Sequence, residues 1–172
     1  MKKIAIAVLL STFVAAPAVA ADTGFYVGIK AGSASKSVTG ASESNSAFGV
    51  FGGYSFNPNF AVEAGYTNLG TVALGNIKFN AMEVSAVGTF PINQQFSLYG
   101  KLGMASTKEE ATLFGTTLSG TRSAATYGLG GQFNVNPNIG IRLGWEHYGF
   151  GDGTIFTQGD ASMVSVAGVF KF

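Results

Sequence analysis

The charged residues best able to act together follow a repeated pattern of charge, apolar residue, glycine and one further residue. The pattern occurs as Lys30-Ala31-Gly32-Ser33, Glu63-Ala64-Gly65-Tyr66, Lys101-Leu102-Gly103-Met104 and Arg142-Leu143-Gly144-Trp145. In an extended strand the charge and the glycine point to the same face, because successive side chains alternate. A long charged side chain beside a glycine has space to lie across a narrow interior. The pattern therefore predicts that three cations and one carboxylate meet at a similar depth.

Glu83 and Glu146 share the parity of these charges and are expected to neutralise the excess of cations. Charges buried together must pair and form hydrogen bonds, because an isolated buried charge is very costly. The alternative is a set of separate, solvated charges on an exposed face. The predicted luminal charge network consists of Lys30, Glu63, Glu83, Lys101, Arg142 and Glu146.

Hydrolytic chemistry would depend on His147, because the chain has one histidine and no cysteine. By parity His147 faces outward, beside inward-facing Glu146. Lipid A deacylases also place a histidine on an outer wall, with a serine two residues later, but here that position is Gly149. We therefore expect no enzymatic activity and an interfacial role for His147, near Trp145 and Tyr148.

Metal and nucleotide binding find little support in the residue spacing. Glu109, Glu110, Asp152 and Asp160 lie in polar connections, and their spacing matches no metal-binding loop. The run Gly128-Leu129-Gly130-Gly131 is not followed by a helix, which a nucleotide loop requires. We expect no metal and no cofactor.

The elements that position these residues are expected to be strands. Segments of about ten residues alternate apolar residues with small or polar ones, the signature of strands in a membrane barrel. The predicted strands lie near 24–33, 46–56, 60–70, 80–90, 95–106, 121–135, 139–149 and 162–172. The sequence therefore predicts an all-β fold, an eight-stranded antiparallel up-and-down transmembrane barrel.

The connections between these strands alternate in length. Three are tight and contain proline, which cannot donate to a strand ladder, at residues 57–59, 91–94 and 136–138. Four are longer and polar, near residues 34–45, 71–79, 107–120 and 150–161. Short turns at one end and long outer loops at the other are typical of outer-membrane barrels.

Composition decides which face points outward. Charged residues make up 11% of the chain, against about 25% in an average soluble domain, and there are 25 glycines. The face opposite the apolar one is mostly Gly, Ala, Ser and Thr, which suits a narrow lumen better than a water-exposed surface. We expect the apolar face to meet lipid, with an interfacial aromatic girdle at Phe25, Phe56, Phe60, Tyr66, Phe90, Phe96, Phe133, Trp145, Tyr148 and Phe172.

The first residues are expected to be a signal peptide, residues 1–20, followed by one barrel domain, residues 21–172. Lys2 and Lys3 precede a short apolar run, and Ala18 and Ala20 form a small-x-small cleavage pattern that places cleavage after Ala20 or Ala21. Removal of the two lysines changes the formal charge from +1 to −1. No basic field remains to attract nucleic acid.

Several of these segments resemble the membrane domain of the OmpA family of small outer-membrane barrels. The resemblance is carried by residues 25–32, by Phe51-Gly52-Gly53-Tyr54-Ser55-Phe56-Asn57-Pro58, and by the tetrads at Glu63 and Arg142. It implies that Lys30, Glu63, Lys101 and Arg142 form the luminal gate network of that family. Val87 and Gln132 depart from it, because the family places an inward lysine and an inward glutamate there. Glu83 or Glu146 is expected to take over as partner.

The resemblance also implies how the chain is assembled and what lies next to it. Phe170 and Phe172 close the last strand like the aromatic C-terminal signal that the barrel-assembly machinery reads. The peptidoglycan-binding domain of full-length family members does not follow Phe172 in this sequence, so no cell-wall tether through it is expected.

We therefore expect a monomeric protein of the Gram-negative outer membrane with a structural role and a filled lumen. Its expected partners are outer-membrane lipid, lipopolysaccharide and the assembly machinery, with no nucleic acid. Two alternatives remain open: a low-conductance porin-like channel, and an adhesin that binds an extracellular ligand through its outer loops.

Overall fold

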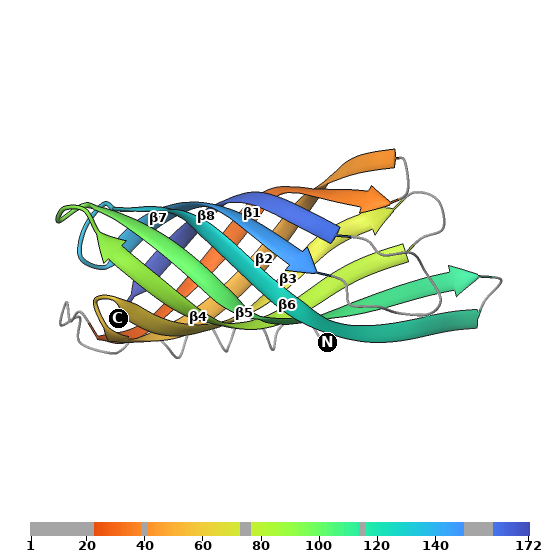
Figure 1. Ribbon diagram of the computed structural model, residues 1–172, viewed down its shortest axis with the longest axis horizontal. Helices are drawn as coiled ribbons and strands as arrows, with labels where there is room; N and C mark the ends of the chain where they lie inside the picture. Colours follow the sequence, from red (N-terminus) through yellow and green to blue (C-terminus); the bar gives the residue numbers. More distant parts are fainter. Residues whose placement is uncertain (1–22, 39–40, 73–76, 114–115, 150–159) are drawn as a thin grey trace, which may run out of the picture.

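The computed structural model describes residues 23–38, 41–72, 77–113, 116–149 and 160–172. They form eight strands: β1 (Gly24–Val38), β2 (Ala41–Asn57), β3 (Phe60–Val72), β4 (Ile77–Pro91), β5 (Phe96–Leu113), β6 (Thr116–Asn134), β7 (Ile139–Gly149) and β8 (Asp160–Lys171). Each strand pairs antiparallel with the next along the chain, and β1 pairs with β8, so that the barrel closes (Figure 1). The predicted fold class and strand number are confirmed. None of the described residues belongs to a helix of the length and apolarity that crossing a bilayer requires.

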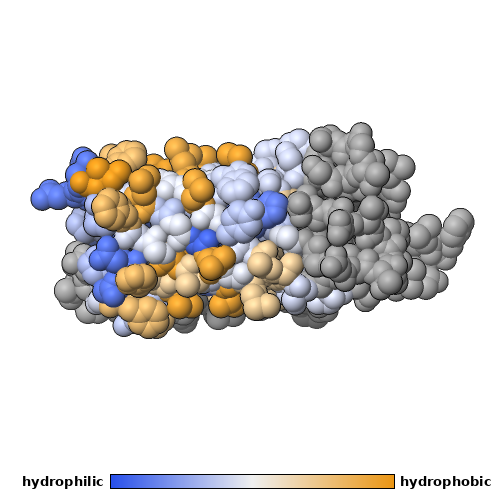
Figure 2. Space-filling view, in the orientation of Figure 1, coloured by the Kyte–Doolittle hydropathy of each residue, from blue (hydrophilic) through white to orange (hydrophobic). Residues whose placement is uncertain are grey.

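Side chains alternate between the two faces of the wall as the sequence pattern predicts. Along β5 the exposed fraction is 5% for Lys101 and 67% for Leu102. Large apolar side chains cover the outside in a band, which Figure 2 shows over the described part of the barrel. Charged side chains such as Lys30, Glu63 and Arg142 are buried inside, together with small polar and apolar ones. This arrangement is inverted relative to a soluble protein, and it is the one that a hydrocarbon environment demands.

The outward apolar band ends at a polar position on every strand. We call these eight positions the outer polar belt: Ser33, Ser46, Asn68, Asn80, Ser106, Ser123, His147 and Ser162. At the opposite end the band is bordered by exposed aromatic rings, among them Phe25, Phe60 and Phe90. Aromatic and polar borders of this kind mark the two interfaces of a membrane-spanning barrel.

The three tight turns share one device. The side-chain oxygens of Asn57, Asn93 and Asn136 each accept hydrogen bonds from the backbone N–H groups two and three residues later, at 2.7–2.9 Å. Asparagine side chains mimic a backbone turn in this way. The predicted reversals are confirmed, and the strand ends on this side lie within one residue of their predicted positions.

Three of the predicted long loops are wrong. Residues 34–38 and 41–45, 71–72 and 77–79, and 107–113 and 116–120 continue the strands as paired hairpins beyond the outer polar belt. Their Ser- and Thr-rich sequences led to the prediction of loops. Strand pairing, however, needs only backbone hydrogen bonds and tolerates polar side chains. Of the fourth predicted loop, residues 150–159 lie outside the described residues, and Asp160 and Ala161 belong to β8.

Candidate functional site in the barrel lumen

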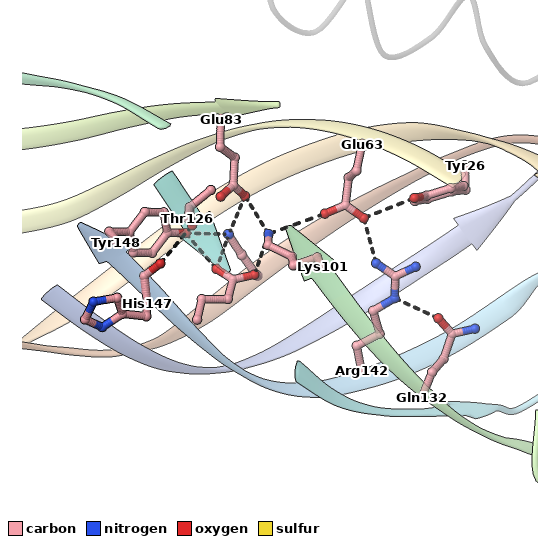
Figure 3. Close-up of polar contacts among 11 residues, drawn as sticks. Tyr26, Glu63, Glu83, Lys101, Thr126, Gln132, Arg142, His147 and Tyr148 are labelled. Carbon is pink, nitrogen blue, oxygen red and sulfur yellow. Dashed lines mark hydrogen bonds and ion pairs between the residues drawn. The ribbon is translucent and has the colours of Figure 1, made fainter. Parts of the chain in front are cut away.

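Two lysines and two glutamates form the first part of a buried ionic cluster. The Lys30 ammonium lies 3.1 Å from a Glu83 carboxylate oxygen and 2.6 Å from one of Glu146. The Lys101 ammonium lies 2.8 Å from both Glu83 and Glu146. Each charge therefore contacts two of the opposite sign, from strands β1, β4, β5 and β7 (Figure 3).

The second part of the cluster is centred on Arg142. Its Nη1 donates to Glu63 at 2.7 Å, and its Nε donates to the side-chain oxygen of Gln132 at 2.7 Å. The Tyr26 hydroxyl donates to the same Glu63 oxygen at 3.1 Å. Lys101 lies 3.7 Å from the other Glu63 oxygen and joins the two parts.

All six residues of the predicted charge network are thus brought together, and their three positive and three negative charges balance. Side-chain exposure is 10% or less for each. Contacts this short, between groups this well buried, fit the requirement that a buried charge be paired. The expectation of one common depth needs refinement. Arg142 and Gln132 border a cavity at the short-turn end, whereas Lys30 reaches Tyr148 on the other side.

Aromatic rings surround Arg142 where the sequence predicted only charges. The guanidinium carbon lies 5.2 Å from the ring centre of Tyr26, 5.4 Å from that of Phe51 and 5.1 Å from that of Tyr99. Cations are attracted to the faces of such rings, most strongly where water is excluded. The inward parity that located the charges also applies to these rings and could have found them.

Tyr148 was assigned to the interfacial girdle, and that assignment is wrong. Its side chain is fully buried in the lumen. Its hydroxyl donates to Glu146 at 2.6 Å and accepts a hydrogen bond from Lys30 at 3.1 Å. Its position two residues after inward-facing Glu146 dictates this direction. Phe25, Phe56, Phe60, Tyr66, Phe90, Phe96 and Phe133 are exposed on the outer wall as predicted.

Apolar side chains fill the lumen between the ionic cluster and the outer hairpins. We call this the apolar layer: Ala34, Ala47, Leu69, Ala81, Ala105, Ala161 and Met163, packed with Tyr148. Each is exposed by 3% or less. At the short-turn end, by contrast, the lumen opens into a cavity of about 710 Å³. The interior therefore consists of three successive zones: cavity, ionic cluster and apolar layer.

His147 lies on the outer wall in contact with aromatic rings. Its ring stacks on Trp145 at 5.9 Å and tilts against Tyr127 at 4.9 Å. Its Nδ1 lies 3.3 Å from Ser162 Oγ on the neighbouring strand. Sequence reasoning looked for a serine along β7 and missed this one, because only the pairing register of β7 with β8 reveals it.

The remaining candidate residues are placed as follows. Ala18, Ala20, Ala21 and Asp152 lie outside the described residues, and Glu109 and Glu110 belong to β5. Phe170 and Phe172 stack edge to face at 5.1 Å, and the Phe172 N–H donates to the Phe25 carbonyl. Within the described ranges, no three His, Asp or Glu residues are grouped as a metal site.

Comparison with known proteins agrees with this architecture. Residues 5–172 match the family described as "Outer membrane protein beta-barrel domain". Outer membrane protein A of Escherichia coli O157:H7 is 31% identical over 194 residues, covering 100% of this chain and 55% of that protein. The chain spans about half the length of the curated relatives that it matches over most of its length.

Solved structures show the same barrel. Neisserial surface protein A superposes with a TM-score of 0.78 at 20% identity, covering 87% of this chain and 97% of that one. The attachment invasion locus protein Ail of Yersinia pestis, solved in complex with the heparin analogue sucrose octasulfate, superposes with a TM-score of 0.64 at 23% identity, covering 88% and 99%. Together with the closed barrel and its lipid-compatible surface, the match over residues 5–172 shows that this chain belongs to the outer membrane protein beta-barrel domain family and is a protein of the bacterial outer membrane.

Proposed function

We propose that the protein is a structural component of the outer membrane, a barrel that supports membrane integrity and keeps its lumen closed. The observation that carries this proposal is the filled interior. The ionic cluster crosses the lumen from β1, β3, β4, β5 and β7, and the apolar layer blocks it again closer to the outer hairpins. A solute would have to displace paired charges and tightly packed side chains in turn.

Planar-bilayer recording tests this proposal against the channel alternative. The folded protein, identified by its heat-modifiable migration in gels, is expected to leave the bilayer non-conducting or to give only rare, small openings. Large and stable pores would contradict the proposal. The variant Leu69→Gly, which opens space in the apolar layer, serves as a comparison, since a rise in conductance shows that the recording detects a loosened lumen.

A second role, in surface interaction, is favoured by the hairpins beyond the outer polar belt. β5 and β6 stay paired as far as Leu113 and Thr116, well past Ser106 and Ser123 of the belt. In a barrel whose short turns face the periplasm, these hairpins project from the cell. The attachment invasion locus protein of Yersinia enterocolitica is 41% identical to this chain over 59 residues, or 34% of the chain. We infer that an extracellular ligand binds at this end.

Shortening of the β5–β6 hairpin tests the surface role. Replacement of residues 108–121 by a two-residue Asn-Gly turn should abolish binding of the protein-bearing cells to host cells or to immobilised sucrose octasulfate. The control is a flexible insertion at the periplasmic turn around Asn93, as long as the segment removed from the hairpin. It should leave binding intact. Unchanged binding after the hairpin is shortened would refute the surface role.

The proposal extends to export, assembly and partners. Residues 1–20 act as the signal peptide, with cleavage after Ala20 or Ala21, and the last strand with Phe170 and Phe172 is read by the assembly machinery. Deletion of Phe172 should lower the amount of folded barrel in the membrane, and unchanged insertion would contradict this role. The folded protein is a monomer in contact with outer-membrane lipid and lipopolysaccharide.

We further propose that the protein is not an enzyme, despite the contact between His147 and Ser162. The backbone N–H groups around this pair belong to the β7–β8 ladder, so they are not available as an oxyanion hole. Hydrolysis of lipid A by the purified protein, lost in Ser162→Ala, would overturn this view.

A further inference from the structure

The cavity at the short-turn end has a chemical character that the structural role does not use. It is about 710 Å³ in volume, with Arg142 at its inner end and Lys171 near its mouth. Its walls carry amides and hydroxyls, among them Ser97, Gln132 and Asn134. No aspartate or glutamate side chain belongs to the described lining. The cavity is therefore a polar space whose charged side chains, among the described lining residues, are two cations.

Hydrogen bonds hold these cations in place along one wall. Arg142 Nε donates to Gln132, the Gln132 amide donates to Asn134 at 2.7 Å, and the Lys171 ammonium donates to the same Asn134 oxygen at 3.2 Å. The chain of contacts runs from β7 through β6 to β8. It orients the donors at both ends of the cavity before any ligand arrives, which lowers the entropy cost of binding.

Arg142 retains hydrogen-bonding capacity on the side of the cavity. A guanidinium has five N–H donors, and within the described residues its hydrogen bonds are made by Nε and Nη1, to Gln132 and Glu63. In Figure 3 no dashed line joins the other terminal nitrogen to any of the residues drawn. Arg142 is only 9% exposed and is nevertheless part of the cavity lining, so a ligand there would meet this nitrogen out of bulk water.

We propose that this cavity is a binding site for a small polar molecule that bears an oxyanion, a carboxylate or a phosphate. The oxyanion accepts hydrogen bonds from Arg142, and the amides and hydroxyls of the walls hold the rest of the molecule. Lys171 attracts the ligand at the mouth, which opens to the periplasmic side. The planar fork of arginine matches both kinds of oxyanion. Glu63, behind the guanidinium, weakens the attraction and keeps the affinity modest.

The site does not depend on whether the lumen conducts, so the conductance result and the binding result are separate. The test uses the full-length folded chain in zwitterionic micelles, with inorganic phosphate and succinate each replacing chloride at constant ionic strength. Backbone amide resonances of Ser97, Gln132 and Asn134 are followed by NMR. We expect saturable shifts with at least one anion and a Kd on the order of 1 mM. The two titrations show whether phosphate or carboxylate is preferred, and the absence of saturable shifts with both would overturn the proposal.

Variants locate the site. The double variant Glu63→Gln/Arg142→Gln removes both charges of one pair, so the lumen stays neutral, and it should abolish the saturable shifts while the barrel still migrates as folded. Lys171→Gln should weaken binding several-fold. Arg122→Gln removes a cation on β6 near the opposite end of the barrel and should bind like the wild type. Wild-type affinity in the double variant, or an equal loss in Arg122→Gln, would show that the anions act elsewhere and would refute the proposal.

Discussion

Glu63 has a special position among the luminal charges, because it joins the two parts of the cluster. It accepts hydrogen bonds from Arg142 and Tyr26 through one oxygen, and its other oxygen faces Lys101 at 3.7 Å. Glu83 and Glu146 share Lys30 and Lys101 between them, so either one partly covers the loss of the other. Among the described carboxylates, only Glu63 pairs with Arg142.

Replacement of Glu63 by alanine should therefore destabilise the barrel strongly. The change leaves the Arg142 guanidinium buried without its carboxylate, and breaking a buried pair in this way costs about 3–5 kcal/mol. The free energy of unfolding, measured in detergent by urea titration, should fall by that amount.

The matched control is the neutral pair Glu63→Gln/Arg142→Gln, which leaves no uncompensated charge and should cost clearly less than Glu63→Ala. If Glu63→Ala unfolds at the same urea concentration as the wild type, the charges are not coupled as the contacts indicate.

For single residues, the sequence predicts well which face of the barrel wall a side chain points to. It predicts poorly which side chains on other strands that residue contacts. Parity along each strand placed Lys30, Glu83 and the other luminal charges inward, because alternation is a property of the strand alone. The contact of His147 with Ser162 depends on the register between two strands, which one strand's sequence does not contain. Tyr148 was misplaced because its aromatic character was given more weight than its parity.

Among the strands, one close approach of two backbones requires a glycine. A Cβ at Gly103 on β5 would collide with the Val84 carbonyl oxygen and with Ser85 on β4. At Gly168 on β8, a Cβ would meet no atom within 4 Å. The two positions therefore separate the effect of a tight strand contact from the general effect of replacing a glycine.

Gly103→Ala should destabilise the barrel by about 1–3 kcal/mol, because the added methyl group forces neighbouring backbone to shift. Gly168→Ala should be neutral or slightly stabilising, since its methyl group enters open space on the lipid side. Thermal unfolding in detergent, read from heat-modifiable migration, compares the two. Equal melting of both variants would contradict the close approach of β4 and β5.

Two positions on the outward face of one strand allow a test of the membrane boundary. The exposed apolar residues of β5 run from Phe96 to Met104, and Ser106 belongs to the outer polar belt. Leu102→Arg should cost about 2–4 kcal/mol in a bilayer, whereas Ser106→Arg, on the same face four residues later, should cost about 0–1 kcal/mol. Folding equilibria in lipid vesicles measure both costs. If Ser106→Arg cost more than Leu102→Arg, the membrane boundary would not lie at the outer polar belt.

The strands themselves are predictable up to the outer polar belt and not beyond it. Between the tight turns and the belt, lipid on one side and the lumen on the other impose alternation, and the predicted ends at the turns agree within one residue. Beyond the belt the sequence no longer alternates between apolar residues and small or polar ones. For that reason residues 107–113 and 116–120 look like a loop although they form a paired hairpin.

The whole molecule depends on one inversion: apolar side chains outside, ionised groups inside. Exposed phenylalanines, leucines and valines cover the barrel between its aromatic and polar borders, while three cations and three carboxylates lie in the lumen. In water this surface would drive aggregation. In a bilayer it is solvated by acyl chains, and the closed ladder satisfies the backbone.

Refolding with and without an amphiphile tests this inversion most directly. The chain from Ala21 onward, diluted from urea into detergent or lipid vesicles, should regain the compact form whose gel migration changes on heating. Diluted into buffer alone, it should aggregate without forming that species. A folded, monomeric and water-soluble barrel in buffer alone would contradict the account, because apolar side chains would then have to fill the interior.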